Sequence, residues 1–241
     1  MGIRGKNILI TGAAVRVGRA MALSVAEAGA NVIIHYDTSA EAAQKTQNEI
    51  KEKGVEAYVL QADLNHLEAV HSLIEKSNKY GPLFALVNNA SLFEDTTFFE
   101  VDTSSWNQHM NVNLTAPFLL SQSFASSLGD DGLGRVVNIL DWRALRPGED
   151  HLPYTISKAG LAALTRSMAI TLAPNITVNG IALGAILPPS DGGKINHILK
   201  DVPSGRWADL DEVGKILMFL LDGPTYITGE IIHLDGGRHL I

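Results

Sequence analysis

The sequence predicts an α/β fold in which helices cover both faces of a parallel β-sheet. Short apolar runs alternate with helical patterns along the whole chain, which is typical of strands that are buried on both faces of such a sheet. In addition, the first run, a glycine-bearing turn, a helix and the second run fit within about 30 residues, the size of one strand–helix–strand unit.

The first half of the chain is predicted to contain four strands and three helices. Apolar runs predict the strands at 6–10, 31–36, 56–60 and 83–88. Apolar residues at helical spacing predict helices at 17–28, 38–53 and 65–79, and a glycine follows each of them closely. Glycine is a common helix terminator because it accepts the left-handed backbone conformation found there.

The second half continues the alternation. Helices are predicted at 103–128, 151–172 and 209–221, and Pro153 is acceptable because it falls in the first turn of its helix. Strands are predicted at 135–140, 176–182 and 230–234, which brings the sheet to seven strands. Since no Pro/Ser-rich linker or block of charge divides the chain, residues 1–241 are expected to form one domain.

Charge and cysteine content limit the class of partner. The net charge of −7 argues against nucleic acid or an anionic membrane surface as the main partner. The chain has no cysteine, which excludes disulfides and thiolate chemistry, and no metal is expected. No apolar run reaches the roughly 18 residues of a membrane span, and the N-terminus has no signal-like apolar segment, so we expect a cytoplasmic protein that acts on a small molecule.

A glycine-containing turn, Thr11-Gly12-Ala13-Ala14-Val15-Arg16-Val17-Gly18, separates the first predicted strand from the first predicted helix. Glycines at this place let the backbone approach a pyrophosphate, which the helix N-terminus attracts. Gly12 and Gly18 fit that role, whereas Arg16 stands where a third glycine is often found. The turn predicts a dinucleotide site; the alternative is a tight turn without a ligand.

The residues after the second strand, Tyr36-Asp37-Thr38-Ser39, are expected to meet the adenosine ribose. An acidic residue here binds the 2′-hydroxyl of NAD and repels the 2′-phosphate of NADP. Asp37 therefore favours NAD, whereas Arg16, Thr38 and Ser39 are suited to a phosphate. We favour NADP, with NAD as the alternative. Thr38 and Glu41 also fit a helix capping box, which is a purely structural interpretation.

Two more strand ends carry polar residues. Asp63, which Leu64 follows, is predicted either to accept a hydrogen bond from the adenine amino group or to cap the next helix. The segment Asn88-Asn89-Ala90-Ser91 follows the fourth strand. Its asparagines can bond backbone groups and hold the sheet end open, and the small Ala90 lets a cofactor lie close; by itself the segment indicates only a turn.

Residues 183–206 follow the sixth strand and are rich in Pro and Gly. They would lie beyond the carboxyl edge of the sheet, where open α/β sheets bind ligands. The segment is interpreted as a substrate loop, and the alternative is a disordered excursion.

Tyr154 and Lys158 are four residues apart, so a helix would place them on one face. The pKa of a phenol is about 10, and a neighbouring ammonium favours the phenolate and so lowers that pKa. Such a pair can pass a proton to or from a substrate near neutral pH. The alternative is a surface pair on a solvated helix.

Together these segments resemble the short-chain dehydrogenase/reductase family. The glycine turn, Asn88-Asn89-Ala90, Asn113 and Tyr154-x-x-x-Lys158 occur in that family's order and spacing, and Val178-Asn179-Gly180-Ile181 and Leu234-Asp235-Gly236-Gly237 match its later part. The resemblance implies a doubly wound, Rossmann-like sheet in the order 3-2-1-4-5-6-7, a nicotinamide cofactor and hydride transfer.

The same resemblance implies roles for single residues. Tyr154 would be the general acid in reduction and the base in oxidation. Lys158 would hold the nicotinamide ribose and lower the pKa of Tyr154, and Asn113 would support a water relay to Lys158 or cap a helix bulge. The cofactor-binding set implied in this way also contains Thr11, Val17, Leu64, Asn89, Ala90, Gly184 and Ile186.

Two positions depart from the family pattern. Asp141 stands where the family usually has serine, and Leu183-Gly184 stands where it often has Pro-Gly. An ionised carboxylate only accepts hydrogen bonds, so Asp141 suits a substrate with N–H donors; buried and protonated, it would serve as a proton reservoir. The alternative is that Asp141 points away from the site.

Pteridine reductases and bacterial dihydromonapterin/dihydrofolate reductases are similar in these departures, with Arg at the position of Arg16 and Asp at that of Asp141. They also have Asn-Ala-Ser followed shortly by an aromatic residue, which here is Asn89-Ala90-Ser91-Leu92-Phe93. The resemblance implies that Phe93 stacks a flat heterocycle against the nicotinamide, that Arg16 touches cofactor phosphate and substrate, and that Ser91 bonds either of them. A core or interface aromatic is the alternative for Phe93. Thr38 departs from this subgroup, which often has a basic residue there.

The sequence therefore predicts an NADP-dependent oxidoreductase that transfers a hydride to a pterin-like substrate, a dihydropteridine, dihydromonapterin or dihydrofolate. Tyr154, aided by Asp141, would supply the proton. The alternatives are a short-chain reductase of a ketone, such as a 3-ketoacyl group, and a non-catalytic nucleotide sensor. The resemblance also implies a homotetramer, or a homodimer, built through the long helices and the C-terminal segment.

Overall fold

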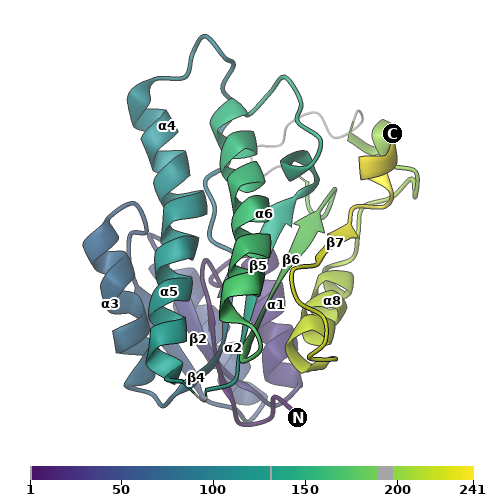
Figure 1. The fold of residues 1–241 in the computed structure, drawn as a ribbon. Coiled ribbons are helices and arrows are strands. Elements are labelled where there is room, and N and C mark those ends of the chain that lie inside the picture. The colour runs from purple at the N-terminus through teal and green to yellow at the C-terminus, as the bar shows by residue number, and fades with distance from the viewer. Residues whose placement is uncertain (1, 131, 189–197) are drawn as a thin grey trace.

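Seven parallel strands form one sheet in the order β3-β2-β1-β4-β5-β6-β7 (Figure 1). The computed structural model describes residues 2–130, 132–188 and 198–241. The predicted fold class and strand order are confirmed. The strands are β1 (Asn7–Ile10), β2 (Asn31–Tyr36), β3 (Ala57–Gln61), β4 (Leu83–Asn88), β5 (Gly134–Asp141), β6 (Ile176–Leu183) and β7 (Ile231–Leu234).

Helices cover both faces of this sheet (Figure 1). One face is covered by α1 (Arg16–Glu27), α2 (Ala40–Glu52) and α8 (Leu210–Asp222). The other face is covered by α3 (Leu67–Asn78), α5 (Ala116–Leu128) and α6 (Leu152–Leu172), while α4 (Thr103–Met110) extends above α5. Short 3₁₀ turns are η2 (Trp142–Ala144), η3 (Leu199–Asp201) and η4 (Arg238–Leu240). Of the helices that the structure describes, none is long and apolar enough to cross a membrane.

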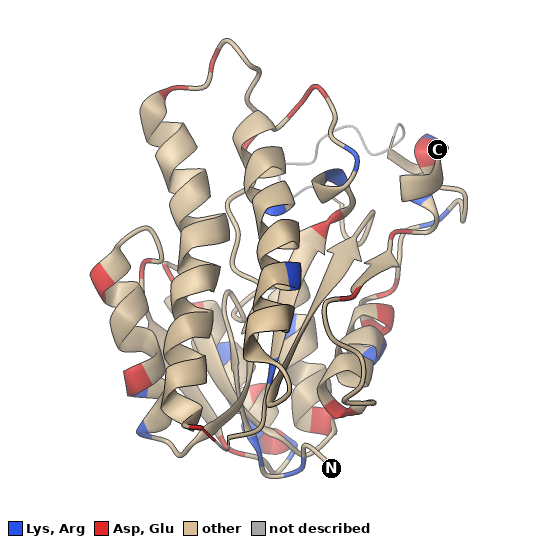
Figure 2. Ribbon diagram, in the orientation of Figure 1, with Lys and Arg blue, Asp and Glu red and all other residues tan. Residues whose placement is uncertain are grey.

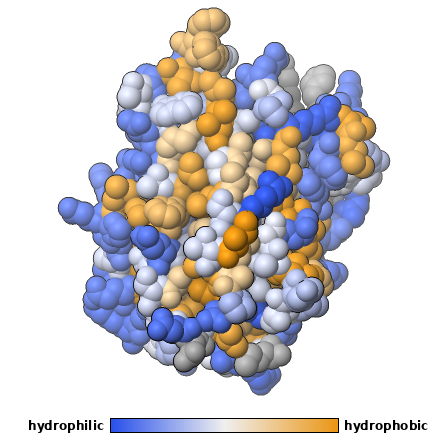
Figure 3. Space-filling model, in the orientation of Figure 1, coloured by the Kyte–Doolittle hydropathy of each residue, from blue (hydrophilic) through white to orange (hydrophobic). Residues whose placement is uncertain are grey.

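The surface over α5 and α6 is more apolar than the rest of the surface seen in this orientation (Figure 3). Helix α5 contains no charged residue, and charged residues gather on α3, on α8 and in the loops (Figure 2). In the same orientation, apolar side chains lie over α5 and α6 (Figure 3). Among them, Phe118 of α5 is 41% exposed and Ile170 of α6 is 82% exposed.

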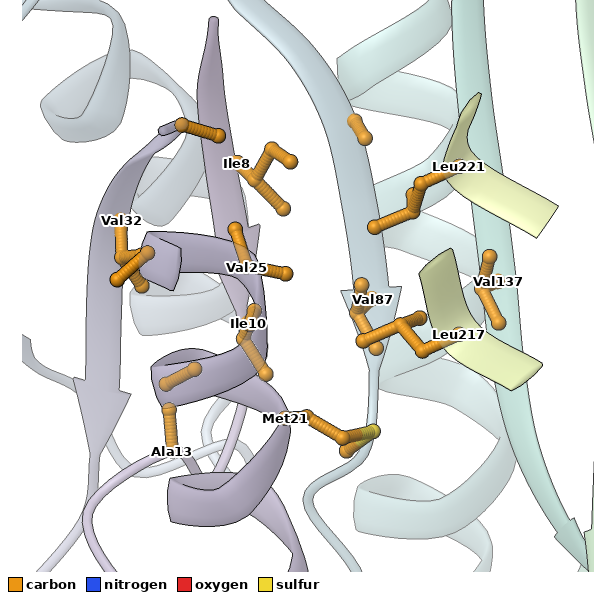
Figure 4. Close-up of a cluster of buried hydrophobic side chains, with 14 of the residues drawn as sticks. Ile8, Ile10, Ala13, Met21, Val25, Val32, Val87, Val137, Leu217 and Leu221 are labelled. Atoms are coloured by element: carbon orange, nitrogen blue, oxygen red, sulfur yellow. The ribbon is translucent and has the colours of Figure 1, made fainter. Parts of the chain in front are cut away.

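The core between the sheet and α1/α8 is built from aliphatic side chains. Ile8 and Ile10 of β1 face Met21 and Val25 of α1, and Leu217 of α8 completes the cluster (Figure 4). None of these five side chains is accessible to solvent. Full burial of such a side chain contributes about 1.5–3 kcal/mol, so this cluster holds α1 and α8 firmly on the sheet.

The parallel strands all end at one edge, and their register decides which polar residues meet there. Asn88 pairs with Asn138, and Asp141 pairs with Leu183, which in turn pairs with Leu234. The carboxyl edge therefore brings together the ends of β4, β5, β6 and β7. The buried amide of Asn88 donates to Oδ1 of Asn138 over 2.8 Å and so joins β4 to β5.

The predicted helix 103–128 is interrupted. Between α4 and α5 the chain forms a single π-helical turn, η1 (Asn111–Thr115). Pro117 has no N–H and leaves the carbonyl of Asn113, four residues earlier, without its α-helical partner, which favours a wider turn here. The prediction of one continuous helix was wrong because the apolar spacing continues through the turn.

One smaller prediction is corrected, and another is only partly covered by the described residues. Helix α2 begins at Ala40, and its N-cap Ser39 makes no side-chain capping bond, so the capping box of Thr38 and Glu41 is not formed. The predicted substrate loop 183–206 is described only in part, because residues 189–197 lie outside the described residues.

Candidate active site

The glycine turn is shaped by two close approaches. Gly12 has φ of +64°, which favours glycine, and a Cβ there would lie 3.0 Å from Cα of Ala90. Gly18, in the first turn of α1, has no room for a Cβ, which would overlap the carbonyl oxygen of Gly12. Both glycines of the predicted motif are therefore needed to bring the turn, the start of α1 and the end of β4 together.

His35 holds this turn in place through a hydrogen bond with its backbone, and no role was predicted for it from the sequence. Its Nδ1 accepts a hydrogen bond of 3.1 Å from the backbone N–H of Gly12. Its Nε2 therefore carries the proton and donates to the carbonyl of Ala62 over 2.9 Å. Burial lowers the pKa of His35 to about 4, although the bond to Ala62 raises it. A polar residue inside the apolar run 31–36 was the signal for such a role.

Thr11 and Asn89 join the ends of β1 and β4. Oγ1 of Thr11 accepts hydrogen bonds from the backbone N–H groups of Asn89, over 2.9 Å, and Ala90, over 3.0 Å. The side-chain amide of Asn89 donates to the carbonyls of Thr11 and Gly12 over 2.8 and 3.1 Å. Asn89 thus bonds backbone groups as expected, whereas the amide of Asn88 donates to the side chains of Asn138 and Ser121.

A cavity of about 560 Å³ opens beside this junction. Most of the predicted cofactor-binding residues at this end of the sheet line it: Gly12, Arg16, Val17, Gly18, Asp63, Leu64, Asn89, Ala90 and Ser91. Lining residues that sequence reasoning did not assign to a site are Val15, His35, Asn65, Leu92, Gln108 and Val112. The cavity runs along the carboxyl edge from the glycine turn to the end of β4.

The end of β2 meets this cavity through Asp37, whereas Tyr36, Thr38 and Ser39 are not among its described lining residues. Burial, and then the charge of Asp63, raises the pKa of Asp37. Asp63 itself accepts a hydrogen bond of 2.8 Å from the N–H of Asn65. The N-cap of α3 is His66, so Asp63 is not the helix cap that the structural alternative expected.

Arg16 reaches from the glycine turn to the segment after β6. Its backbone has a positive φ of 51°, unusual for a residue with a side chain. Its Nη2 donates a hydrogen bond of 2.9 Å to the carbonyl of Pro188, in the described part of the predicted substrate loop. The guanidinium therefore lies between the cavity and that loop.

Tyr154 and Asp141 meet at the ends of α6 and β5. The Tyr154 hydroxyl donates a hydrogen bond of 3.1 Å to Oδ2 of Asp141. Burial, and then the charge and hydrogen bond of Asp141, raises the pKa of Tyr154 well above its usual value. This is the opposite of the lowering expected from Lys158, because burial and the carboxylate outweigh the lowering effect of the nearby Arg143 charge.

The pKa of Asp141 also differs from that of an ordinary, exposed aspartate. Burial raises its pKa, and the bond from the N–H of Arg143, with the charges nearby, offsets that effect only partly. The Arg143 N–H to Asp141 Oδ1 distance is 2.9 Å. Asp141 points into the site beside Tyr154, so the alternative in which it points away is wrong, and it holds a proton to a higher pH than an exposed carboxyl does.

Lys158 lies one helical turn beyond Tyr154 and is buried. Its ammonium donates a hydrogen bond of 2.8 Å to the carbonyl of Ile139 and lies 5.7 Å from the centroid of the Tyr154 ring. Burial lowers the pKa of Lys158 to about 8, although the charge of Asp141 raises it. The pair is buried, so the alternative of a solvated surface pair is wrong.

Asn113, in the π turn, joins the cavity to the catalytic helix. Its Oδ1 accepts from the N–H of Leu92 over 2.8 Å and from the hydroxyl of Ser91 over 3.2 Å. Its amide donates to Oγ of Ser157 over 3.0 Å and to the carbonyl of Leu92 over 3.0 Å. Ser157 lies between Tyr154 and Lys158 on α6. Its bond with Asn113 therefore fixes the distance between this part of α6 and the cavity.

Phe93 lies beside the phenol of Tyr154. The two rings meet edge to face with centroids 4.7 Å apart, and the His151 ring stacks on Phe93 with centroids 4.1 Å apart. Nδ1 of His151 donates to the carbonyl of Glu94 over 2.8 Å, which holds the stack. Phe93 is 54% exposed, so the interpretation as a core aromatic is wrong.

Trp142 ties the end of β5 to the C-terminal turn. The guanidinium carbon of Arg238, in η4, lies 4.2 Å from the Trp142 ring centroid, and that of Arg143 lies 5.0 Å from it. Gly184 packs on this region, since a Cβ there would lie 2.6 Å from Cα of Asp235. Ile186 is buried in the core cluster with α1 and α8 rather than exposed in the cavity.

The chain was compared with known proteins. The model of the short chain dehydrogenase family matches residues 6–196. A curated relative, the 3-oxoacyl-[acyl-carrier-protein] reductase FabG of Aquifex aeolicus, is 35% identical over 98% of both chains. The 5-keto-D-gluconate 5-reductase of Escherichia coli strain K12 is 31% identical over 98% of this chain and 96% of its own.

A solved structure with close similarity is that of FolM alternative dihydrofolate reductase 1 from Brucella canis, complexed with NADP. It superimposes with a TM-score of 0.92 and is 36% identical, covering 100% of this chain and 97% of that one. The chains thus match over their whole lengths, with both a pterin-type reductase and ketone reductases among the similar proteins.

Proposed function

The chain belongs to the short-chain dehydrogenase family of oxidoreductases, and from that membership we propose that it reduces a C=N bond of a pterin-like substrate with NADPH. The substrate class is a dihydropteridine, dihydromonapterin or dihydrofolate. The observation that carries this proposal is the 3.1 Å hydrogen bond between Tyr154 and Asp141, beside the exposed ring of Phe93. The 36% identity to a NADP-bound FolM dihydrofolate reductase supports the same class.

The chemistry of Asp141 suits a ring nitrogen better than a ketone. An ionised carboxylate beside a carbonyl would oppose the negative charge that develops on the oxygen. A pterin ring offers N–H donors, which a carboxylate accepts, and a basic nitrogen, which a carboxylic acid protonates. Because burial raises the pKa of Asp141, this side chain is suited to hold the proton that such a reduction consumes.

The residues present fit a nicotinamide cofactor, because the glycine turn leaves no room for a Cβ at Gly18 and the cavity beside it is lined by the predicted residues. When bound, the reduced cofactor supplies the hydride. Tyr154 gives its hydroxyl proton to the ring nitrogen next to the carbon that takes the hydride, and Asp141 returns a proton to the phenolate. Lys158 stabilises the phenolate through its charge. Asn113, through its bond to Ser157, holds this part of α6 at a fixed distance from the cavity.

At the adenosine end, Arg16 and Asp37 oppose one another in the choice of cofactor. The guanidinium of Arg16 attracts the 2′-phosphate of NADP, whereas the carboxylate of Asp37 suits the 2′-hydroxyl of NAD. We place NADP first because Arg16 lines the cavity and the similar FolM structure is complexed with NADP. Phe93 would carry the flat ring of the substrate on its exposed face, and Ser91 would bond cofactor or substrate.

Reduction of a ketone is the second candidate, because the FabG and 5-keto-D-gluconate relatives are named for that reaction. The test is oxidation of NADPH by the purified protein with dihydrobiopterin and dihydrofolate, compared with acetoacetyl-CoA and 5-keto-D-gluconate. Turnover of the pterins at a kcat/KM at least about tenfold above that of the ketones is expected. Turnover of ketones alone would overturn the proposal. Membership of an oxidoreductase family argues against the third reading, a non-catalytic nucleotide sensor.

The proposal includes a homotetramer, or a homodimer, located in the cytoplasm. The exposed apolar residues Phe118, on the charge-free helix α5, and Ile170, on α6, support association there (Figure 3). Leu240, at 74% exposed, supports a second contact through the C-terminal segment. Light scattering after size exclusion is expected to give two or four chains, and Ile170→Asp to lower that number; a monomeric wild type would contradict this part.

A further inference from the structure

One guanidinium lies between two carboxylates next to the catalytic tyrosine. Arg143 makes a two-point contact with Asp150, with Nη2 to Oδ2 at 3.1 Å and Nε to Oδ1 at 3.4 Å. Its remaining nitrogen, Nη1, is 3.9 Å from Oδ1 of Asp141. The guanidinium is therefore turned toward Asp150 and makes no direct hydrogen bond to Asp141.

We propose that Asp150 is a positioning residue that holds the Arg143 guanidinium off Asp141, so that the Asp141 carboxyl can keep a proton for Tyr154. This role rests on the proposed function, in which Asp141 returns a proton to the tyrosine. No role for Asp150 or Arg143 follows from the family pattern of the catalytic tyrosine and lysine.

The geometry favours Asp150 in the competition for Arg143. A two-point contact between guanidinium and carboxylate is stronger and more directional than a single one. The bond to Asp150 uses both the Nε and the Nη2 positions, which leaves one nitrogen for Asp141. Burial raises the pKa of Asp150, but its hydrogen bond with Arg143 and the charges of Arg143 and His151 more than offset that effect. The pKa of Asp150 is therefore lowered overall, so Asp150 stays ionised and keeps its partner.

Hydrogen bonds satisfy both oxygens of Asp141, and its ion pair with Arg143 is a long one, at 3.9 Å. Oδ1 accepts from the backbone N–H of Arg143 over 2.9 Å, and Oδ2 accepts from Tyr154 over 3.1 Å. A direct ion pair would lower the pKa of a carboxyl by about 1–3 units. If Asp150 released Arg143, Nη1 would need to move by only about 1 Å to bond Asp141 at the usual distance of an N–H···O bond.

The charged and titratable groups that face Asp141 come from three parts of the chain. Tyr154 and Lys158 belong to α6, and the effects of both lower its pKa, as does the charge of Arg143 in η2. Arg238, in the C-terminal turn, interacts with Asp141 and is repelled by Arg143. Of these groups, Arg143 makes hydrogen bonds to Asp150, whereas Arg238 interacts with Asp150 only through charge, so a change at Asp150 reaches Asp141 mainly through the Arg143 side chain.

The test measures the protonation of Asp141 directly, so that it does not depend on any substrate. Carbon-13 NMR of aspartate carboxyl carbons in the full chain gives the titration midpoint of Asp141, assigned by the signal that disappears in Asp141→Asn. In Asp150→Asn, this midpoint is expected to fall by about one pH unit or more, because Arg143 becomes free to bond Asp141. Asp150→Glu, which keeps the charge, is expected to restore most of the difference.

Two controls separate this role from a general change of charge. Glu149→Gln removes the same charge from an exposed neighbour and is expected to leave the midpoint unchanged. Arg143→Gln is expected to raise the midpoint, and in that background Asp150→Asn is expected to have no further effect, as a double-mutant cycle requires.

An Asp141 midpoint that is unchanged or raised in Asp150→Asn overturns the proposal, whatever the enzyme reduces. A protein that shows the shift but turns over only ketones would leave this positioning role intact and overturn the pterin assignment instead. Where pterin turnover is found, the limb of the pH profile of kcat/KM that reports Asp141 is expected to move with the NMR midpoint.

Discussion

The hydroxyl of Tyr154 lies 3.1 Å from Oδ2 of Asp141; the carboxylate raises the pKa of the phenol, whereas the hydrogen bond from Tyr154 lowers the pKa of the carboxyl. A buried phenol next to a carboxylate is a poor acid by itself, since loss of its proton would place two negative charges together. The proton of Tyr154 therefore leaves most easily when Asp141 carries a proton of its own. This coupling makes both side chains targets for mutation.

Removal of the phenol hydroxyl is expected to stop turnover and leave cofactor binding intact. In Tyr154→Phe, kcat with dihydrobiopterin should fall by about 10²–10⁴-fold, because the proton donor is lost. The Kd of NADPH, measured by calorimetry, should stay within about twofold of wild type. Tyr226→Phe, at a fully exposed position, is the matched control and should keep full activity. A Tyr154→Phe enzyme with normal kcat would remove the basis of the mechanism.

Asp141 is expected to make the protein less stable as pH rises. Its folded pKa is raised by burial, so its contribution to stability is present below the unfolded pKa and is lost as pH rises through the folded value. Relative to Asp141→Asn, the free energy of unfolding of wild type should decline as pH rises above about 4, the usual pKa of an aspartate, by about 1.4 kcal/mol for each unit by which the folded pKa is raised. Urea unfolding at several pH values measures this; parallel curves for the two proteins would contradict it.

His35 is expected to have the opposite pH dependence. Its folded pKa of about 4 lies below the usual 6.5, so its contribution to stability is present above pH 6.5 and is lost as pH falls toward 4. The loss is about 3 kcal/mol over that window, from about 1.4 kcal/mol per unit. His35→Asn, which keeps an acceptor for Gly12, should remove this slope, and exposed His66→Asn should keep it. An unchanged slope in His35→Asn would contradict the assignment.

Gly18 is expected to tolerate no side chain. A Cβ would overlap the carbonyl oxygen of Gly12, so Gly18→Ala should destabilise the protein by about 1–3 kcal/mol and weaken NADPH binding, because α1 is pushed from the turn. Thermal unfolding and NADPH fluorescence titration measure the two effects. The control is Gly2→Ala, where a Cβ meets no atom within 4 Å, and it should behave like wild type.

Asp37 is expected to limit the preference for NADPH. Asp37→Asn removes a negative charge from the cavity lining, and the Kd ratio of NADH to NADPH should rise about fivefold, which corresponds to about 1 kcal/mol at the surface of a protein. Asp130→Asn makes the same charge change at an exposed site outside the cavity lining and should leave the ratio unchanged. A ratio that falls in Asp37→Asn would mean that Asp37 does not face the ribose.

The sequence predicted the order of strands and helices well, because buried parallel strands and amphipathic helices leave simple patterns. It also predicted which motifs lie at the carboxyl edge, since every strand of a parallel sheet ends there. The resemblance to a family added the strand order, which local patterns do not contain. The π turn at Asn113 was missed because its cause, Pro117, lies two positions beyond the residues that change shape.

The pKa values of the site residues were harder to predict from the sequence than the positions of these residues in the fold. The spacing of Tyr154 and Lys158 gave the sign of one pairwise effect, whereas the pKa of Tyr154 is set mainly by burial and by Asp141, thirteen positions away in sequence. His35 was missed for a related reason. Its partners, Gly12 and Ala62, come from two other strand ends, and only the folded chain shows that all three meet.

The contact of Arg238 with Trp142 has a practical consequence for anyone who purifies this protein. The C-terminal turn sits on the residue that follows Asp141, whereas the N-terminus lies at the far end of the sheet (Figure 1). An affinity tag attached after Ile241 would disturb the contact of Arg238 with the Trp142 indole, next to the proton-transfer pair, and so change the measured kcat and KM. The tag belongs in front of Met1, with a protease site for its removal.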